Sequence, residues 1–112
     1  MEAKDIIYKH KSIFTDDHGA ISCPYLEVPE EWLPYLDVLF SEIIEHLKRE
    51  PDTAPMTFYT VSEVRGLLVM DYDGGDEYLE GMLTISSRYS PLWSAPLSVV
   101  GEASKSRDNN IL

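Results

Sequence analysis

The longest regular pattern of apolar positions lies between about residues 30 and 50. Apolar side chains recur there at steps of three and four residues: Trp32, Leu36, Leu39, Phe40, Ile43, Ile44 and Leu47. This spacing is typical of a helix with one apolar face. Pro34 is tolerated only in the first turn of a helix, where its missing N–H would have no intrahelical partner. The helix is therefore expected to begin at Leu33 or Pro34.

Two shorter apolar runs follow and predict a β-hairpin. Residues 56–64 and residues 67–72 have the aromatic and β-branched composition of strands. Arg65-Gly66 between them is expected to form a hairpin turn or a bulge, and Gly74-Gly75 is expected to end the second strand.

A second helix is predicted from Asp76, a favourable N-cap residue, to Tyr89. Its apolar face is expected to contain Tyr78, Met82, Ile85 and Tyr89, with Leu79 and Leu83 beside them. Pro91 ends the helix, and residues 96–100 are expected to form a short edge strand.

The N-terminal part of the chain is less regular. Residues 2–14 fit either a short helix or an edge strand, residues 16–19 predict a turn, and residues 21–28 are expected to be extended or irregular. The order of elements predicts an α+β fold, in which two main helices pack on one face of a small antiparallel sheet. We expect one domain over residues 1–101, followed by a polar, flexible C-terminal tail over residues 102–112.

Composition narrows the class of protein. The chain has 112 residues, of which 44% are hydrophobic, as expected for a globular domain. Its only cysteine, Cys23, excludes an internal disulfide and a cysteine-rich zinc site, which suits a reducing compartment. We expect a cytoplasmic protein, because the charged N-terminus is unlike a secretory signal and no apolar run reaches the ~20 residues of a membrane span.

The strongest deviation is charge: 20 acidic residues against nine basic ones give a formal net charge of −11. Direct nucleic-acid binding is disfavoured, since it requires Lys and Arg to displace counterions. The expected partner is a basic protein. Its binding site is predicted to contain the densest acidic segment and two aromatic anchors: Asp71, Tyr72, Asp73, Asp76, Glu77, Glu80 and Trp93. A competing acidic surface is Asp37, Glu42 and Glu45 on the long helix.

The acidic segment differs from a calcium-binding loop. With Asp71 in the first position, such a loop requires Gly in the sixth position and Glu in the twelfth, whereas the chain has Asp76 and Met82. No metal or other cofactor is therefore predicted. A solvated turn with a helix cap remains the alternative to an acidic patch.

Candidate catalytic residues are scattered. His10, His18 and His46 do not stand at metal-ligand spacing, and Cys23 is expected to be a buried, inert thiol. Neither GxxxxGK[ST] nor GxSxG occurs in the chain. These observations favour a protein without catalytic activity.

A resemblance to small phage-associated proteins of unknown function is carried by two stretches, EEWLPYLDVLFSEI and VSEVRGLLVMDYDGGDEYLEGMLTISSRYS. Those proteins carry a helix that begins with Gly-Trp, a Val-Lys-Glu-Lys-Phe-Gly-Gly-Leu-Arg-Phe-Tyr hairpin and a following helix. The corresponding positions here are Trp32, Val61, Glu63, Gly66, Leu67 and Tyr72. The resemblance implies the order helix, hairpin, helix. It does not extend to their cysteine pair, because this chain continues with SPLWSAPLSVV.

The leading hypothesis is a non-catalytic acidic protein that neutralises a partner, either as a toxin-immunity protein or other small inhibitor, or as a phage-encoded inhibitor or nucleic-acid mimic acting on a host or defence protein. Two alternatives remain open. One is a small metal-dependent enzyme that uses the carboxylates of residues 71–80. The other is an assembly subunit whose second helix presents its apolar face to another copy; the sequence leaves the oligomeric state open.

Overall fold

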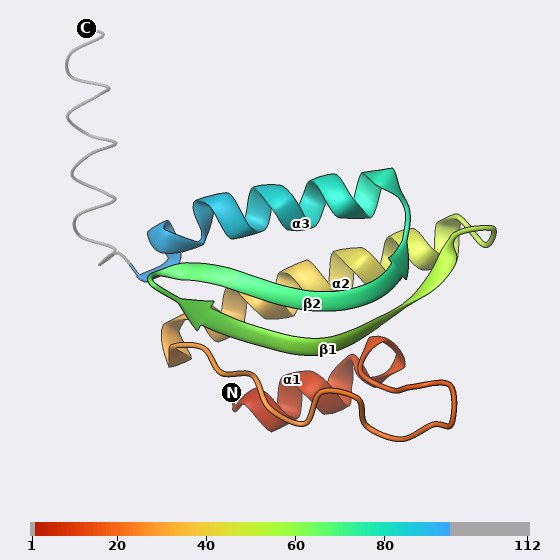
Figure 1. Ribbon diagram of the computed structural model, residues 1–112, viewed down its shortest axis with the longest axis horizontal. Coiled ribbons are helices and arrows are strands. Elements are labelled where there is room, and N and C mark those ends of the chain that lie inside the picture. Colours follow the sequence, from red (N-terminus) through yellow and green to blue (C-terminus); the bar gives the residue numbers. More distant parts are fainter. Residues whose placement is uncertain (1, 95–112) are drawn as a thin grey trace, which may run out of the picture.

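The computed structural model describes residues 2–94. It contains three α-helices, two strands and three short 3₁₀ turns: α1 (Ala3–Lys9), η1 (Lys11–Ile13), η2 (Glu30–Trp32), α2 (Leu33–Arg49), β1 (Ala54–Val64), β2 (Leu67–Gly75), α3 (Glu77–Tyr89) and η3 (Ser90–Ser94). Figure 1 shows the hairpin in front of α2, with α3 along one side and α1 along the other. The predicted α+β class is therefore confirmed.

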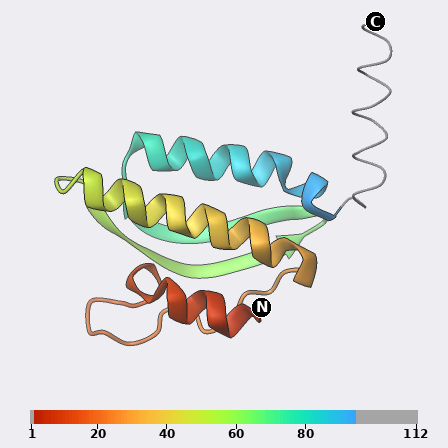
Figure 2. The same ribbon diagram turned by 180° about the vertical axis from the view of Figure 1, so that it is seen from behind.

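The hairpin has two unlike faces. Leu68, Met70 and Tyr72 on β2 point inward, whereas Val69 and Asp71 between them are exposed. Helix α2 lies behind the strands in Figure 1 and in front of them in the reverse view of Figure 2, and α3 runs beside β2 with Leu79 and Leu83 buried in the same core. No helix within residues 2–94 covers the other face of the hairpin. This arrangement confirms the prediction that the two main helices pack on one face of the sheet.

The two edges of the hairpin also differ. Along β1, Glu27 forms a short parallel bridge: its N–H donates to the carbonyl of Val61 at 2.9 Å, and its carbonyl accepts from the N–H of Glu63 at 2.9 Å. Residues 21–28 are thus irregular, as expected, apart from this bridge and an antiparallel bridge between Ile21 and Thr15. The opposite edge belongs to β2 and faces α3.

Helix α2 begins at Leu33, as the position of Pro34 in the sequence indicates. The 3₁₀ turn η2 leads directly into Leu33, so Pro34 lies in the first turn. The buried face of α2 consists of Leu33, Leu36, Leu39, Phe40, Ile43 and His46. The periodic stripe therefore covers the inner face of the hairpin, and Trp32 is buried in the core as predicted.

The second strand ends at Gly74-Gly75 as predicted, but it includes both glycines and is longer than the apolar run over residues 67–72. Strand β2 continues to Gly75, which pairs with Ala54. Both glycines have a positive φ of 86°, and a Cβ on Gly74 would lie 1.8 Å from the carbonyl oxygen of Pro55. Gly74 is needed because β1 and β2 approach each other closely here, and the positive φ of both glycines favours a residue without a Cβ where the strand ends.

Helix α3 is capped by Asp76, as predicted, but its buried residues are Leu79 and Leu83. Tyr78, Ile85 and Tyr89, which the spacing places on an apolar face, are each more than half exposed.

At the N-terminus, residues 2–14, which fitted either a helix or an edge strand, contain the helix α1. The predicted strand over residues 96–100 and the tail over residues 102–112 lie outside the described residues.

We predict that Gly74→Ala destabilises the protein more than Gly66→Ala. Gly66 has a φ of 85°, and no atom lies within 4 Å of the place that an added Cβ would take, so this control costs only the left-handed strain of about 1–2 kcal/mol. Gly74→Ala adds the collision with Pro55, at a further cost of about 1–3 kcal/mol. Urea unfolding of both variants measures the difference; equal midpoints would contradict this account of the strand contact.

Candidate functional site

Asp71 and Asp73 lie on the uncovered face of the hairpin. They alternate along β2 with the inward-pointing Tyr72 and are both exposed. The hydroxyl of Tyr59 donates to Oδ2 of Asp73 at 3.1 Å. Tyr59 is the extra residue of a bulge in β1, which aims its ring across the strands toward Asp73. This face therefore offers two carboxylates and an exposed tyrosine in one place.

A second pair of acids, Asp16 and Asp17, lies near Tyr59 although it comes from a distant part of the sequence. The hydroxyl of Thr57 donates to the carbonyl of Thr15 at 3.3 Å, which places their turn beside β1. The pKa of Tyr59 is raised, first by its hydrogen bond to Asp73, with further contributions from burial and from the charges of Asp73, Asp17 and Asp16. The Asp16 turn is well formed, because Oδ1 of Asp16 accepts from the N–H of His18 at 2.8 Å and of Ala20 at 3.0 Å. We call Asp16, Asp17, Tyr59, Asp71 and Asp73 the acidic face.

Asp76 has a structural role at the start of α3. Its Oδ1 caps the helix by accepting from the N–H of Leu79 at 2.9 Å. Its Oδ2 lies 2.7 Å from Nε2 of His46 and accepts from the hydroxyl of Thr53 at 3.1 Å. The pKa of Asp76 is lowered, chiefly by the bond to His46 and then by the backbone bond to Leu79. Of the predicted site residues on α3, only Glu77 and Glu80 are left exposed.

Tyr72 points to the other side of the sheet from Asp71 and Asp73. Its ring contacts Phe58, with 5.5 Å between ring centroids, and is partly buried between β2 and α3. Burial raises the pKa of Tyr72, and the charge of Glu80 raises it further. Tyr72 is therefore a wall residue of a groove and does not belong to the acidic face.

Trp93 lies at the opposite end of α3 from Asp76. The 13-residue helix separates the two by about 20 Å. Trp93 is half-buried as predicted, stacks on Tyr35 with 5.2 Å between ring centroids, and meets Trp32 edge-on at 5.6 Å. It lines an apolar groove of about 510 Å³ between α2 and α3. The seven predicted site residues thus lie on three separate surfaces.

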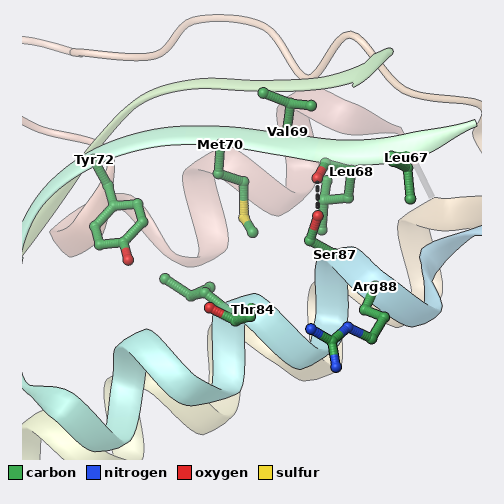
Figure 3. A pocket seen from close by; sticks show the side chains of 9 residues that line it. Leu67, Leu68, Val69, Met70, Tyr72, Thr84, Ser87 and Arg88 are labelled. Atoms are coloured by element: carbon green, nitrogen blue, oxygen red, sulfur yellow. Dashed lines mark hydrogen bonds between the residues drawn. The ribbon is translucent and has the colours of Figure 1, made fainter. Parts of the chain in front are cut away.

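A second groove, with a volume of about 540 Å³, lies beside Tyr72. Its walls come from β2 and α3: Leu67, Leu68, Val69, Met70, Tyr72, Leu83, Thr84, Ser87 and Arg88. Figure 3 shows Met70 and Tyr72 pointing from the strand toward the helix, and Thr84 and Arg88 on the helix side. We call this the strand–helix groove.

Two histidine–aspartate pairs were not foreseen from the sequence. Nε2 of His10 lies 2.7 Å from Oδ1 of Asp37, which Lys9 also contacts at 3.1 Å. The second pair is His46 and Asp76. Both histidines are buried, and together the pairs join α1 and α3 to α2. Asp37 is therefore paired with His10 and Lys9 and does not belong to the competing acidic surface on α2. Glu42 and Glu45 of that surface are exposed.

The chemistry that these groups can perform is limited by their partners. The Cys23 thiol is buried and contacts the carbonyl of Tyr25 at 3.2 Å, and burial raises its pKa. Within residues 2–94, no three His, Cys, Asp or Glu side chains are placed so as to hold a metal ion.

In the same residues, no helix is long and apolar enough to cross a membrane.

Comparisons of the chain with protein-family models, curated proteins and solved structures gave no match.

We predict that Asp37 stabilises the fold above about pH 4 and loses this effect in acid. Its pKa is lowered by the bond to His10, with help from Lys9. Because the pKa of Asp37 is lower in the folded state, its contribution to stability is fully present above the pKa of the unfolded chain, about 3.9. This contribution is lost as the pH falls through the pKa of the folded state. Asp37→Asn is therefore expected to be less stable at pH 7 and to lose less stability than the wild type between pH 5 and pH 2.

Urea unfolding across this pH range provides the measurement. Asp71→Asn is the control, because Asp71 is exposed and accepts no side-chain hydrogen bond from the described residues. This variant should keep the acid dependence of the wild type. Parallel stability curves for the wild type and Asp37→Asn would show that the Asp37 pair contributes nothing to the acid dependence.

Proposed function

We propose that this chain is a non-catalytic acidic binding protein that neutralises a basic protein partner. The observation that supports the proposal most strongly is the acidic face. The bond from Thr57 to Thr15 places the Asp16-Asp17 turn beside β1, near Tyr59 and Asp73. Asp71 lies two residues from Asp73 on the same side of the sheet, which none of the described helices covers. Clustered carboxylates repel one another, but together they create a negative potential that attracts a positively charged surface.

The mechanism follows from the two kinds of side chain on this face. The carboxylates attract a positively charged surface over a distance of about one Debye length, which accelerates the encounter. Tyr59 and Tyr25, which line the same shallow pocket, are both exposed and supply contacts with little loss of side-chain entropy once the surfaces meet. A toxin-immunity protein and a phage-encoded inhibitor are the two forms that we propose for this activity.

A second candidate function is self-assembly through α3. Tyr78, Ile85 and Tyr89 are each more than half exposed and lie on one side of the helix, and Leu92 continues the apolar surface at 60% exposure. Exposed apolar residues that lie together commonly mark an interface. Sedimentation over a range of protein concentrations tests this candidate, and a monomer at all of them would remove it.

The binding proposal predicts that a tagged form of the protein retains one stoichiometric basic protein from a lysate of its own host at low salt and releases it as salt rises. The double variant Asp71→Asn with Asp73→Asn should associate with this partner about three- to tenfold more slowly at low salt, since it loses steering charge.

The matched control is Glu30→Gln with Glu31→Gln. It removes the same number of charges from η2, where both residues are exposed. This control should change the association rate less than about twofold. An association rate that does not depend on salt, or an equal effect of the two double variants, would contradict the role of the acidic face.

A further inference from the structure

The outer edge of β2 directs unused backbone groups toward the strand–helix groove. In an antiparallel pair, alternate residues direct both their N–H and C=O away from the neighbouring strand. Leu68 is such a residue, because its N–H donates to the hydroxyl of Ser90 at 2.8 Å and its carbonyl accepts from the hydroxyl of Ser87. By the same alternation, Met70 and Tyr72 also direct their backbone groups outward.

The edge is closed at Leu68 and open beyond it. The hydroxyls of Ser87 and Ser90 take the place that a neighbouring strand would occupy beside Leu68. Among residues 2–94, no side chain or loop makes a comparable bond to the backbone of Met70 or Tyr72. An open edge of this kind is a template for one more strand.

The groove has room for such a strand and an apolar lining for its side chains. It measures about 540 Å³ and runs between β2 and α3. Met70 and Leu83 contribute apolar surface, and the ring of Tyr72 forms one end, as Figure 3 shows. An added strand would pair with the backbone of Met70 and Tyr72 and place alternate side chains against this lining.

The charges around the groove favour a basic occupant. Glu77 and Glu80 are exposed and lie seven and four positions before Thr84 on α3, so they continue the helix wall of the groove toward its Tyr72 end. The charge of Glu80 also raises the pKa of the Tyr72 hydroxyl. Arg88 is at the other end of the groove, beside Leu67 and Leu68. The Tyr72 end is therefore negative, and it lies on a molecule with a net charge of −11.

We propose that the open edge of β2 binds an extended, basic segment of a partner protein as an added strand. This inference rests on the proposed function, since it takes the partner to be basic. The segment pairs with Met70 and Tyr72, places apolar side chains in the strand–helix groove, and brings Lys or Arg to Glu80. The serine hydroxyls at Leu68 mark the end of the pairing.

The test uses two fluorescent peptides of about eight residues with blocked ends, long enough to match a typical strand. One alternates Lys and Val; the other alternates Lys and Pro, which keeps the charge but removes half of the backbone N–H donors. In an antiparallel pairing, the residue that bonds to Met70 or Tyr72 also turns its side chain toward the groove, so Pro in that place cannot donate to β2. The full-length protein is expected to bind the Lys-Val peptide about tenfold more tightly than the Lys-Pro peptide. No binding of the Lys-Val peptide, or equal binding of both, would overturn the inference.

Three variants locate the site. Thr84→Trp fills the groove from α3, and Met70→Pro removes an outward N–H that the hairpin does not use. Each should weaken binding of the Lys-Val peptide about tenfold or more. The control Ile85→Trp places the same side chain one position along α3, outside the groove and at an exposed site, and should leave affinity within about twofold. Circular dichroism checks that each variant is folded.

The outcomes separate this inference from the proposed function. If the basic partner from the lysate binds Thr84→Trp and Met70→Pro as tightly as the wild type, then the acidic binding protein stands and the strand addition is wrong. If Thr84→Trp instead converts a dimer into a monomer, the occupant is a second copy of the chain, and the inference is again wrong. Absence of any salt-sensitive basic partner would count against the proposed function itself.

Discussion

The fold depends on the mutual contact of three phenylalanines. Phe14 follows η1, Phe40 lies in α2 and Phe58 in β1, and all three are fully buried. Their ring centroids lie 5.0, 5.5 and 5.7 Å apart, so each ring touches the other two. The chain has only these three phenylalanines. Replacing any one would leave a cavity lined by the other segments, because all three segments meet at these rings.

This packing decides which surfaces are left for a partner. Phe58 and its inward neighbours pack against α2, so the alternate residues of the hairpin are turned outward. Asp71 and Asp73 of the acidic face are among these outward residues. The strand–helix groove arises from the same constraint. Asp76 fixes the start of α3 to His46 of α2, and the serines at the end of the helix fix it to Leu68, so the wall of the groove is held at both ends.

Local sequence signals predicted most of the elements, and contacts between distant residues account for what they missed. The stripe of α2 and the cap at Asp76 could be predicted because their determinants lie within a few residues of one another. The pairing of His10 with Asp37 could not be predicted, because 27 residues separate them and no local sequence motif marks either residue. The seven predicted site residues are likewise not grouped. Tyr72 points to the opposite face from Asp71 and Asp73, because side chains alternate along a strand, and Trp93 is separated from Asp76 by the length of α3.

Amide hydrogen exchange of the free protein, followed residue by residue with NMR, tests the open edge of β2 most directly. The amide of Leu68 should exchange slowly, since it is bonded to Ser90, whereas the amides of Met70 and Tyr72 should exchange quickly. Addition of the basic partner or the Lys-Val peptide should slow the last two selectively. Slow exchange at Met70 and Tyr72 in the free monomer would show that this edge is already occupied, and would contradict the strand addition.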